Sequence, residues 1–252
     1  MKLAHLSWPE VAAISRETVV LVPTGSLEQH GPHLPLFTDS LLVTRVAEEV
    51  EARCSDEVLL TPTLWLGASG HHLAFPGTLS ASFSGYEEAL TQVILSLKRH
   101  GFHRFFVLNG HGGNTELNGI ALRKLKEADP SLTLGHSGYF AFIGELVGKT
   151  LTGPLKEIRH ACEAEASLML HLFPELVRQE KLRDDGLRPS GDLRGMVHLF
   201  DEITEQGSYG FATLATAEKG KILYDAAVAG CVEQMRALAA GYTLDSIVKD
   251  PT

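Results

Sequence analysis

Short apolar runs alternate with longer amphipathic segments along this chain, and the two patterns predict different elements. A run of three or four apolar residues between polar stretches is typical of a buried strand. Such runs occur at 19–22, 58–60, 105–108 and 132–134. Apolar residues that recur every three or four positions predict helices instead. This spacing is found in 42–53, 84–100, 117–125 and 160–171, and again in a long segment that follows Thr216.

The order of these elements predicts the fold class. Strands that alternate with helices of this length are typical of an α/β protein in which a mostly parallel central sheet carries helices on both faces, a three-layer α/β/α architecture. No linker or low-complexity stretch divides the chain. We therefore expect one domain that extends over residues 1–252.

Local signals mark where helices begin and where regular structure is absent. Thr38 is expected to cap the first long helix, since threonine is a preferred residue at that position. Ser84 and Glu87 have the spacing of a capping box. The segments 139–159 and 181–206 show no regular pattern, so we expect loops there.

Composition excludes several classes of protein. The chain has 252 residues, of which 44% are hydrophobic, enough to bury one large core. Its formal net charge of -9 argues against a nucleic-acid partner. No apolar stretch has the length of a membrane span and the first residues do not resemble a signal peptide, so we expect a cytoplasmic protein with no membrane partner. The three cysteines lack the spacing of a metal site and are expected to be reduced thiols.

Carboxylates and imidazoles crowd the segment after the first predicted strand. Glu28 and His30 lie two positions apart, so in an extended chain both side chains point to the same side. Asp39 lies at the start of the following helix, from which it can turn back toward that pair. Glycine and proline residues between them exclude regular structure and predict a loop.

A second polar motif follows the strand at 105–108 and contains His111 within the glycine-rich segment 109–114. Because ligand loops gather at the carboxyl ends of parallel strands, we expect His111 to meet the loop that carries Glu28. Glutamate, aspartate and histidine without thiolates form a ligand set that suits Zn, Mn or Fe(II). The sequence therefore predicts a metal site shared by the two loops.

Further candidates lie outside these two loops. His160, Glu163 and Glu165 come together near the start of a predicted helix. Acidic residues in a first helical turn also stabilise the helix dipole, so a structural role stays open for both glutamates. His72 is expected to line the pocket. His33 is expected to bind backbone or a carboxylate through a ring nitrogen.

These motifs together resemble the creatininase family, the creatinine amidohydrolases. The matching blocks are 25–33 with Asp39, 75–78, 109–114, 160–167 and 215–220. The resemblance implies a hydrolase of α/β/α architecture that uses two divalent metal ions, Zn, Mn or Fe(II), to cleave an amide C–N bond. It also implies a homo-oligomer, commonly a hexamer built as a trimer of dimers.

The resemblance assigns roles to individual residues. Glu28 and His111 would hold one metal ion. His30 would hold the other, and Asp39 would bridge both. A hydroxide that bridges the metals would attack the amide carbonyl. His160 would shuttle a proton to the leaving nitrogen, a task for which a histidine is well suited near neutral pH.

Two departures from creatininase change what we expect. Creatininase has a carboxylate where this chain has Gly113, so one ligand of the second metal must come from elsewhere. Glu165 is the candidate shared with creatininase, and Glu163 is the one that can substitute, as a ligand or as a catalytic group. The aromatic residues that sandwich creatinine are not evident before His160, which disfavours creatinine as the substrate.

The expected substrate is a small cyclic or linear amide, and other amides stay open. Members of the family act on a peptide bond in the precursor of a small redox cofactor and on a formamide in the precursor of a pyrimidine nucleotide. The residues expected to contact the substrate are Ser69, His72, Gly112, Gly113 and Tyr139.

Two non-enzymatic readings compete with hydrolysis. In the first, the loop 111–113 cradles a phosphate at a helix N-terminus as an anion-binding module. The carboxylates of Glu28 and Asp39 disfavour an anion in the same pocket. In the second, the chain is an inactive family member that serves as a structural partner. The presence of the candidate ligands and of His160 disfavours it.

Overall fold

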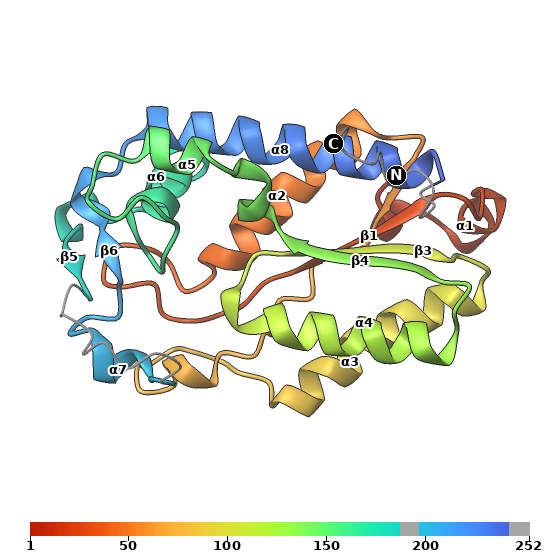
Figure 1. Ribbon diagram of the computed structural model, residues 1–252, viewed down its shortest axis with the longest axis horizontal. Helices are drawn as coiled ribbons and strands as arrows, with labels where there is room; N and C mark the ends of the chain where they lie inside the picture. The colour runs from red at the N-terminus through yellow and green to blue at the C-terminus, as the bar shows by residue number, and fades with distance from the viewer. Residues whose placement is uncertain (187–196, 242–252) are drawn as a thin grey trace, which may run out of the picture.

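The structure is a computed structural model that describes residues 1–186 and 197–241. At its centre lies a four-stranded parallel sheet with the strand order β2-β1-β3-β4 (Figure 1). The strands are β1 (Val19–Thr24), β2 (Val58–Leu60), β3 (Arg104–Asn109) and β4 (Thr133–Gly138). All four lie where apolar runs predicted strands, and β4 extends furthest beyond its run.

Helices cover both faces of this sheet (Figure 1). One face is covered by α2 (Thr38–Arg53) and α8 (Ala217–Ala239), with α6 (Glu163–Leu172) packed beside α8. The other face is covered by α3 (Phe83–Arg99) and α4 (Thr115–Ala128). The expected α/β class, with three layers and a parallel central sheet, is confirmed.

β1 shows why a continuous apolar run forms a strand between two helical layers. All six of its residues are buried. Val19 and Leu21 pack into the core on the side of α2, α6 and α8, whereas Val20 and Val22 pack into the core on the side of α3 and α4. Successive side chains of a strand alternate between its faces, so a strand covered on both sides needs an apolar residue at almost every position.

Two helices begin differently from the prediction. Thr38 is the first residue of α2 rather than its cap, and its hydroxyl donates to the carbonyl of Pro35 at 2.7 Å. Ser82 rather than Ser84 caps α3, because its hydroxyl accepts from the backbone N–H of Gly85 at 3.1 Å. The two serines lie two residues apart in the sequence, and the sequence pattern did not show which of them caps the helix.

The remaining helices and strands are short. They are α1 (Trp8–Ala13), α5 (Leu146–Thr150), α7 (Phe200–Ile203), β5 (Asp184–Asp185) and β6 (Gly210–Phe211), and β5 pairs with β6 in antiparallel fashion. Two of the helices and β5 fall in 139–159 and 181–206, where loops were expected; residues 187–196 of the second segment lie outside the described part. None of the helices in the described ranges is both long enough and apolar enough to cross a membrane.

Candidate metal centre

A cavity of about 290 Å³ opens at the carboxyl ends of β1 and β3. The loops that follow these two strands meet there, as expected for a parallel sheet. The lining residues are Glu28, Asp39, His71, His72, 110–113, Phe140, Ile158, Arg159, His160, Glu165 and Phe200. Carboxylates and imidazoles form one part of the wall, and apolar side chains form the rest.

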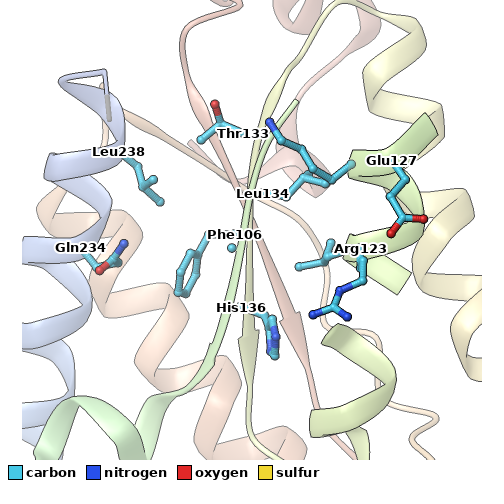
Figure 2. Close-up of a pocket in the computed structure, with 11 residues that line it drawn as sticks. Phe106, Arg123, Glu127, Thr133, Leu134, His136, Gln234 and Leu238 are labelled. Atoms are coloured by element: carbon cyan, nitrogen blue, oxygen red, sulfur yellow. The ribbon is translucent and has the colours of Figure 1, made fainter. Parts of the chain in front are cut away.

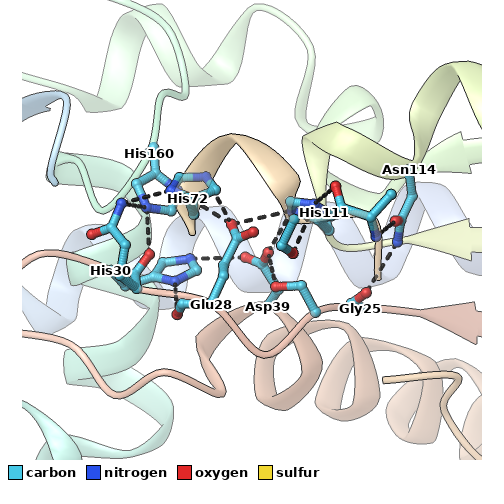
Figure 3. Close-up of polar contacts among 12 residues, drawn as sticks. Gly25, Glu28, His30, Asp39, His72, His111, Asn114 and His160 are labelled. Atoms are coloured by element: carbon cyan, nitrogen blue, oxygen red, sulfur yellow. Dashed lines mark hydrogen bonds and ion pairs between the residues drawn. The ribbon is translucent and has the colours of Figure 1, made fainter. Parts of the chain in front are cut away.

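His111 faces two buried carboxylates (Figure 3). Its Nδ1 lies 3.2 Å from Glu28 Oε1 and 3.0 Å from Asp39 Oδ2. Its Nε2 donates to the carbonyl of Ala68 at 3.2 Å, which leaves Nδ1 to face the carboxylates. The hydroxyl of Ser26 donates to Asp39 Oδ2 at 2.8 Å and fixes that oxygen. Two buried carboxylates around one imidazole nitrogen require a cation between them, either a proton or a metal ion.

Asp39 faces a histidine with each of its carboxylate oxygens. Oδ2 faces His111, while Oδ1 lies 3.0 Å from His30 Nε2. The other ring nitrogen of His30 donates to the backbone carbonyl of Glu28 at 3.2 Å and so orients the ring. A carboxylate in this position can bridge two cations, which is the arrangement that the resemblance implied for Asp39.

Glu165 lies on the His30 side of the cavity. Potential ligand atoms of His30, His160 and Glu165 all lie within 4.8 Å of one another. Glu165 is buried, and its Oε2 accepts from the backbone N–H of Ala161 at 2.5 Å. The structure thus brings one of the two glutamates of the α6 segment to the group formed by Glu28, His30, Asp39 and His111.

The buried carboxylates and imidazoles of this cluster shift one another's pKa values. Burial raises the pKa of Glu165 to about 8, and the charge of Asp39 adds to the effect. Although burial opposes protonation, the same Asp39 charge raises the pKa of His30 to about 9. Glu28 Oε2 is buried and has no hydrogen-bond partner among the described residues. Because an unpaired buried carboxylate oxygen is costly, Glu28 fits the role of ligand to a divalent cation.

Gln29 orients a histidine of the cavity wall. Its Oε1 accepts from the backbone N–H of Gly31 at 2.9 Å. Its amide nitrogen donates to the carbonyl of Gly207 at 2.8 Å and to His72 Nδ1 at 2.7 Å. His72 then carries its hydrogen on Nε2, which lies 3.3 Å from Glu28 Oε1. His72 therefore acts as a donor that holds the Glu28 carboxylate in place.

His160 precedes α6 instead of lying within it. Its Nε2 donates to the backbone carbonyl of Gln29 at 2.7 Å, so Nδ1 is the nitrogen left for the cavity, 3.7 Å from Glu28 Oε1. Burial, with the charges of His30 and His72, holds the pKa of His160 well below its ordinary value. A neutral imidazole with a free nitrogen can accept a proton at this point.

The residue after His160 has an unusual backbone conformation. Ala161 has a φ of 49°, in the left-handed region that disfavours residues with a side chain. Its carbonyl accepts from His33 Nε2 at 2.9 Å, and its N–H donates to Glu165. The expected backbone contact of His33 is therefore present. These two contacts hold the turn that directs His160 at the cavity.

Glu163 lies away from the cavity, and this corrects the expectation that it serves as a ligand or catalytic group. Its carboxylate accepts from the backbone N–H groups of Thr152 at 2.8 Å and Gly153 at 2.9 Å, and from Lys219 Nζ at 2.6 Å. Residues two apart in a helix point about 200° apart. Glu163 and Glu165 therefore leave α6 in nearly opposite directions, and Glu163 joins segments of the fold.

The structure divides the residues that were expected to contact a substrate. His72, Gly112 and Gly113 line the cavity. Ser69 does not line it, because its buried hydroxyl lies behind His111, 3.4 Å from Nε2. Tyr139 is 1% exposed and packs within the core on the α8 side of the sheet. Ser69 and Tyr139 are thus placed as supporting residues.

Several lining residues were not expected from the sequence. They are His71, Phe140, Ile158 and Phe200. His71 had a signal, since it is adjacent to His72 in a glycine-containing loop. Phe200 had none, because it belongs to a segment without a pattern, although its ring lies 4.0 Å from that of His72, centroid to centroid.

The fold and this cluster define a class of protein: a three-layer α/β/α protein with a buried carboxylate-imidazole centre suited to divalent cations. A family model for creatininase, described as creatinine amidohydrolase, matches residues 4–235. The chain therefore belongs to the creatininase family. The matched range includes every residue of the cluster.

Three similar proteins show the range of this family. The mycofactocin precursor peptide peptidase of Mycobacterium ulcerans is 33% identical over 231 residues, which cover 86% of this chain and 84% of the relative. The 3-dehydro-scyllo-inosose hydrolase of Thermotoga maritima is 31% identical over 226 residues, which cover 81% of this chain and 72% of the relative. A solved mutant creatininase of Zn-Zn type is 29% identical, with a TM-score of 0.80, and the match covers 93% of this chain and 96% of that chain.

Proposed function

We propose that the chain is a metal-dependent hydrolase that cleaves an amide C–N bond in a small substrate. The observation that carries the proposal is the position of Asp39, whose two oxygens face His30 and His111. Glu28 and Glu165 add a carboxylate on either side of this group. Oxygen and imidazole ligands without a thiolate suit Zn, Mn or Fe(II).

In this proposal the chain holds two divalent cations. Glu28 and His111 would hold one, His30 and Glu165 would hold the other, and Asp39, which lies between the two groups, would serve both. The unpartnered Oε2 of Glu28 supports the assignment, as does the Zn-Zn type of the similar creatininase. Bound in this way, such cations lower the pKa of water and polarise the carbonyl under attack.

His160 carries the proton in this scheme. Its Nε2 is engaged by the carbonyl of Gln29, so Nδ1 is the atom that exchanges protons with the reacting groups. Burial keeps the pKa of His160 low, so the ring is neutral and its Nδ1 carries no proton. This nitrogen accepts a proton and then donates it to the departing amine.

The cavity walls indicate the kind of amide. Phe140, Ile158 and Phe200 add apolar surface beside the polar cluster. Arg159 lines the cavity too, with its guanidinium paired to Glu157. We infer that the substrate has an apolar portion next to the bond that is cleaved.

The terminal bond of a short peptide is a second candidate substrate. Arg159 offers the charge and planar donors that recognise a carboxylate such as a peptide C-terminus. The similar protein of Mycobacterium ulcerans is named as a precursor peptide peptidase. A peptide cleaved near its end would place a carboxylate close to the reacting bond.

Elemental analysis together with an activity assay tests the proposal. After supplementation with Zn, Mn or Fe(II), the purified protein is expected to hold about two metal ions per chain. It is expected to hydrolyse at least one member of a panel of lactams, formamides and short peptides. His111→Ala should lower metal content and activity together while the far-ultraviolet circular dichroism stays unchanged. Protein that takes up no metal, or a His111→Ala variant with full metal content, would contradict the proposal.

A further inference from the structure

His71 lies beside His111 on the short 3-10 helix at Gly70–His72. The two rings are nearly parallel, with centroids 5.7 Å apart and planes inclined by 13°. His71 is half-buried and lines the cavity. Neither of its ring nitrogens has a hydrogen bond to any residue in the described part of the chain. Besides His111, its ring contacts those of His72 and Phe200, whose centroids are 4.3 Å and 5.8 Å away.

Three groups, one of them the His71 ring, leave no room for a side chain at residue 113. A Cβ atom placed on Gly113 would lie 2.8 Å from His71 Cε1 and 2.5 Å from both His111 Nε2 and the carbonyl oxygen of Ala68. No side chain fits there without displacing these groups. This is the position at which creatininase has a carboxylate. Here the carbonyl of Ala68 and the imidazoles of His111 and His71 fill the space that such a side chain would enter.

We propose that His71 is a further ligand of the cation held by Glu28 and His111. The inference rests on the proposed function, since it needs a metal ion in the cluster. Potential ligand atoms of these three residues lie within 4.8 Å of one another. Bonds from zinc to imidazole nitrogen are about 2.0–2.1 Å long, so ligands of one cation lie at most about 4 Å apart. In this proposal the His71 ring shifts toward the cation to close this difference.

The neighbouring His72 does not compete for this role. Its Nδ1 accepts from Gln29, and its Nε2 hydrogen faces Glu28, so both nitrogens already have partners. His71 has both nitrogens available. A neutral imidazole as an additional ligand adds no negative charge to the cluster, which favours metals that prefer nitrogen ligands, such as Zn, over Mn.

Cobalt binding tests this role without requiring a substrate. Metal-free wild type, His71→Ala and His103→Ala are titrated with Co(II), and the visible absorption of the bound ion is recorded. His103 is a half-buried histidine just before β3, outside the cavity, and serves as the matched control. His71→Ala should weaken one of the two binding events at least about tenfold and shift its absorption bands. His103→Ala should match the wild type.

The outcomes separate this inference from the proposed function. A wild type that binds Co(II) and a His71→Ala variant with the same affinities and the same spectrum would refute the role of His71 alone. A wild type that binds no Co(II) would refute the metal centre and with it the ligand role. His71→Glu provides a second check, because a carboxylate at this position should restore affinity while giving a spectrum that differs from that of the wild type.

A separate observation concerns the outer edge of β4 (Figure 2). β4 (Thr133–Gly138) pairs with β3 on one side, and no strand in the described ranges pairs with its other side. Its sequence, Thr-Leu-Gly-His-Ser-Gly, contains no proline and no lysine or acidic residue. Proteins usually protect an open strand edge with such residues, with bulges or with a covering segment. This edge has the features of one that is paired in the assembled protein.

A groove of about 820 Å³ lies along this edge, between α4 and α8. Arg123 and Glu127 line it from α4, and Gln234 and Leu238 line it from α8 (Figure 2). The two charged residues are exposed, lie one helical turn apart and form no ion pair within the described part of the chain. The groove thus presents adjacent positive and negative charges that lack partners.

We infer that β4 pairs with β4 of a second copy of this chain, antiparallel and about a twofold axis. Such a pair continues the sheet across both copies and places the two α4 helices side by side in opposite directions. Under a twofold axis, a positive and a negative residue on one helix face the negative and the positive residue of the same helix in the other copy. Arg123 of each copy comes within reach of Glu127 of the other.

Charge reversals on α4 test this interface. The mass in solution is measured by light scattering for the wild type, Arg123→Glu, Glu127→Arg and the double variant. Each single reversal should lower the mass, and the double variant should recover it. Arg99→Glu, the same charge change on the exposed surface of α3, should leave the mass unchanged. Hydrogen exchange should show protected amides on the outer edge of β4 in the wild type and faster exchange in the single variants.

Two results would overturn the interface. A wild type that is monomeric at micromolar concentration excludes it, and protected β4 amides in that monomer would mean that another part of the chain covers the edge. A wild-type oligomer that survives both single reversals uses a different surface.

Discussion

Lys219 Nζ lies 2.6 Å from Glu163 Oε1, in an ion pair whose side chains are 15% and 3% exposed. The pair joins the first turn of α8 to the first residue of α6. Glu163 also accepts from the backbone N–H of Thr152, in the segment that leads to His160. One carboxylate therefore fastens three parts of the chain around the candidate site.

Replacing Lys219 with methionine should destabilise the fold. Glu163 then stays buried without its cation, and breaking a buried pair in this way typically costs about 3 kcal/mol. Urea denaturation of the metal-free protein measures the change in the free energy of unfolding. Metal content should stay at the wild-type level. Loss of metal without loss of stability would return Glu163 to the set of candidate ligands.

Glu165→Gln should have the opposite effects: it should lower the metal content and leave the stability of the metal-free protein unchanged or higher. The metal-free variant keeps the hydrogen bond to Ala161 and loses one of several crowded carboxylates, so its stability should equal or exceed that of the wild type. Metal content should fall from about two ions per chain to about one. Elemental analysis and thermal denaturation of Glu163→Gln and Glu165→Gln, side by side, check this contrast between two glutamates of one helix.

The stability of the metal-free protein should fall as the pH rises from about 6.5 to 9. Asp39 raises the pKa of His30 from 6.5 to about 9 against the effect of burial, so the folded state binds a proton that the unfolded state releases in this range. Burial raises the pKa of Glu165 from 4.5 to about 8, so the folded state keeps this proton after the unfolded state has lost it, and stability falls further up to about pH 8. Both groups act in the same direction. Melting temperatures measured with a chelator between pH 6 and 9 test the slope, and a flat profile would contradict it.

Gln29→Leu should impair the site and the fold together. The substitution leaves the backbone N–H of Gly31 and the carbonyl of Gly207 without their partner, at a cost of about 1–3 kcal/mol. It also frees His72, so the Glu28 carboxylate loses its fixed orientation. Metal affinity should fall about tenfold or more. Gln29→Glu keeps the acceptor for Gly31 but places a buried carboxylate oxygen against the carbonyl of Gly207, so it too should be less stable than the wild type.

Much of the fold could be predicted because the strands of a covered parallel sheet leave a plain signal. β1 is apolar at almost every position, since both of its faces are buried. Glu28, Asp39 and His111 could be predicted as one cluster for a related reason. Each lies just beyond a strand or at the start of a helix, and parallel topology brings such positions to one edge.

The sequence could not predict which of the two glutamates, Glu163 or Glu165, faces the cavity. α6 is buried around most of its circumference, with Ala164, Ala166 and Leu168 all enclosed. An amphipathic helix shows by its polar stripe which side faces solvent, and a helix enclosed on all sides has no such reference. Only the packing of α6 against α8 decides which glutamate meets the cavity.

The aromatic residues that line the cavity could not be predicted, because their positions depend on packing between segments far apart in the sequence. Phe200 reaches His72 from a segment without regular spacing. Tyr139, by contrast, follows β4 directly and was expected to face a substrate, yet it turns into the core. The end of a strand determines where the backbone of such a residue lies, but packing against neighbouring elements determines the direction of its side chain.

The candidate ligands are spread along the sequence from Glu28 to Glu165. The strands that precede Glu28 and His111 are also far apart in the sequence, and Val20 of one pairs with Phe105 of the other. A polypeptide leaves the ribosome N-terminus first. Until Glu165 has emerged and α6 has docked, a nascent chain offers only loose fragments of the centre. If the proposed centre binds metal, it can do so in its final geometry only late in biosynthesis, after both cores have closed.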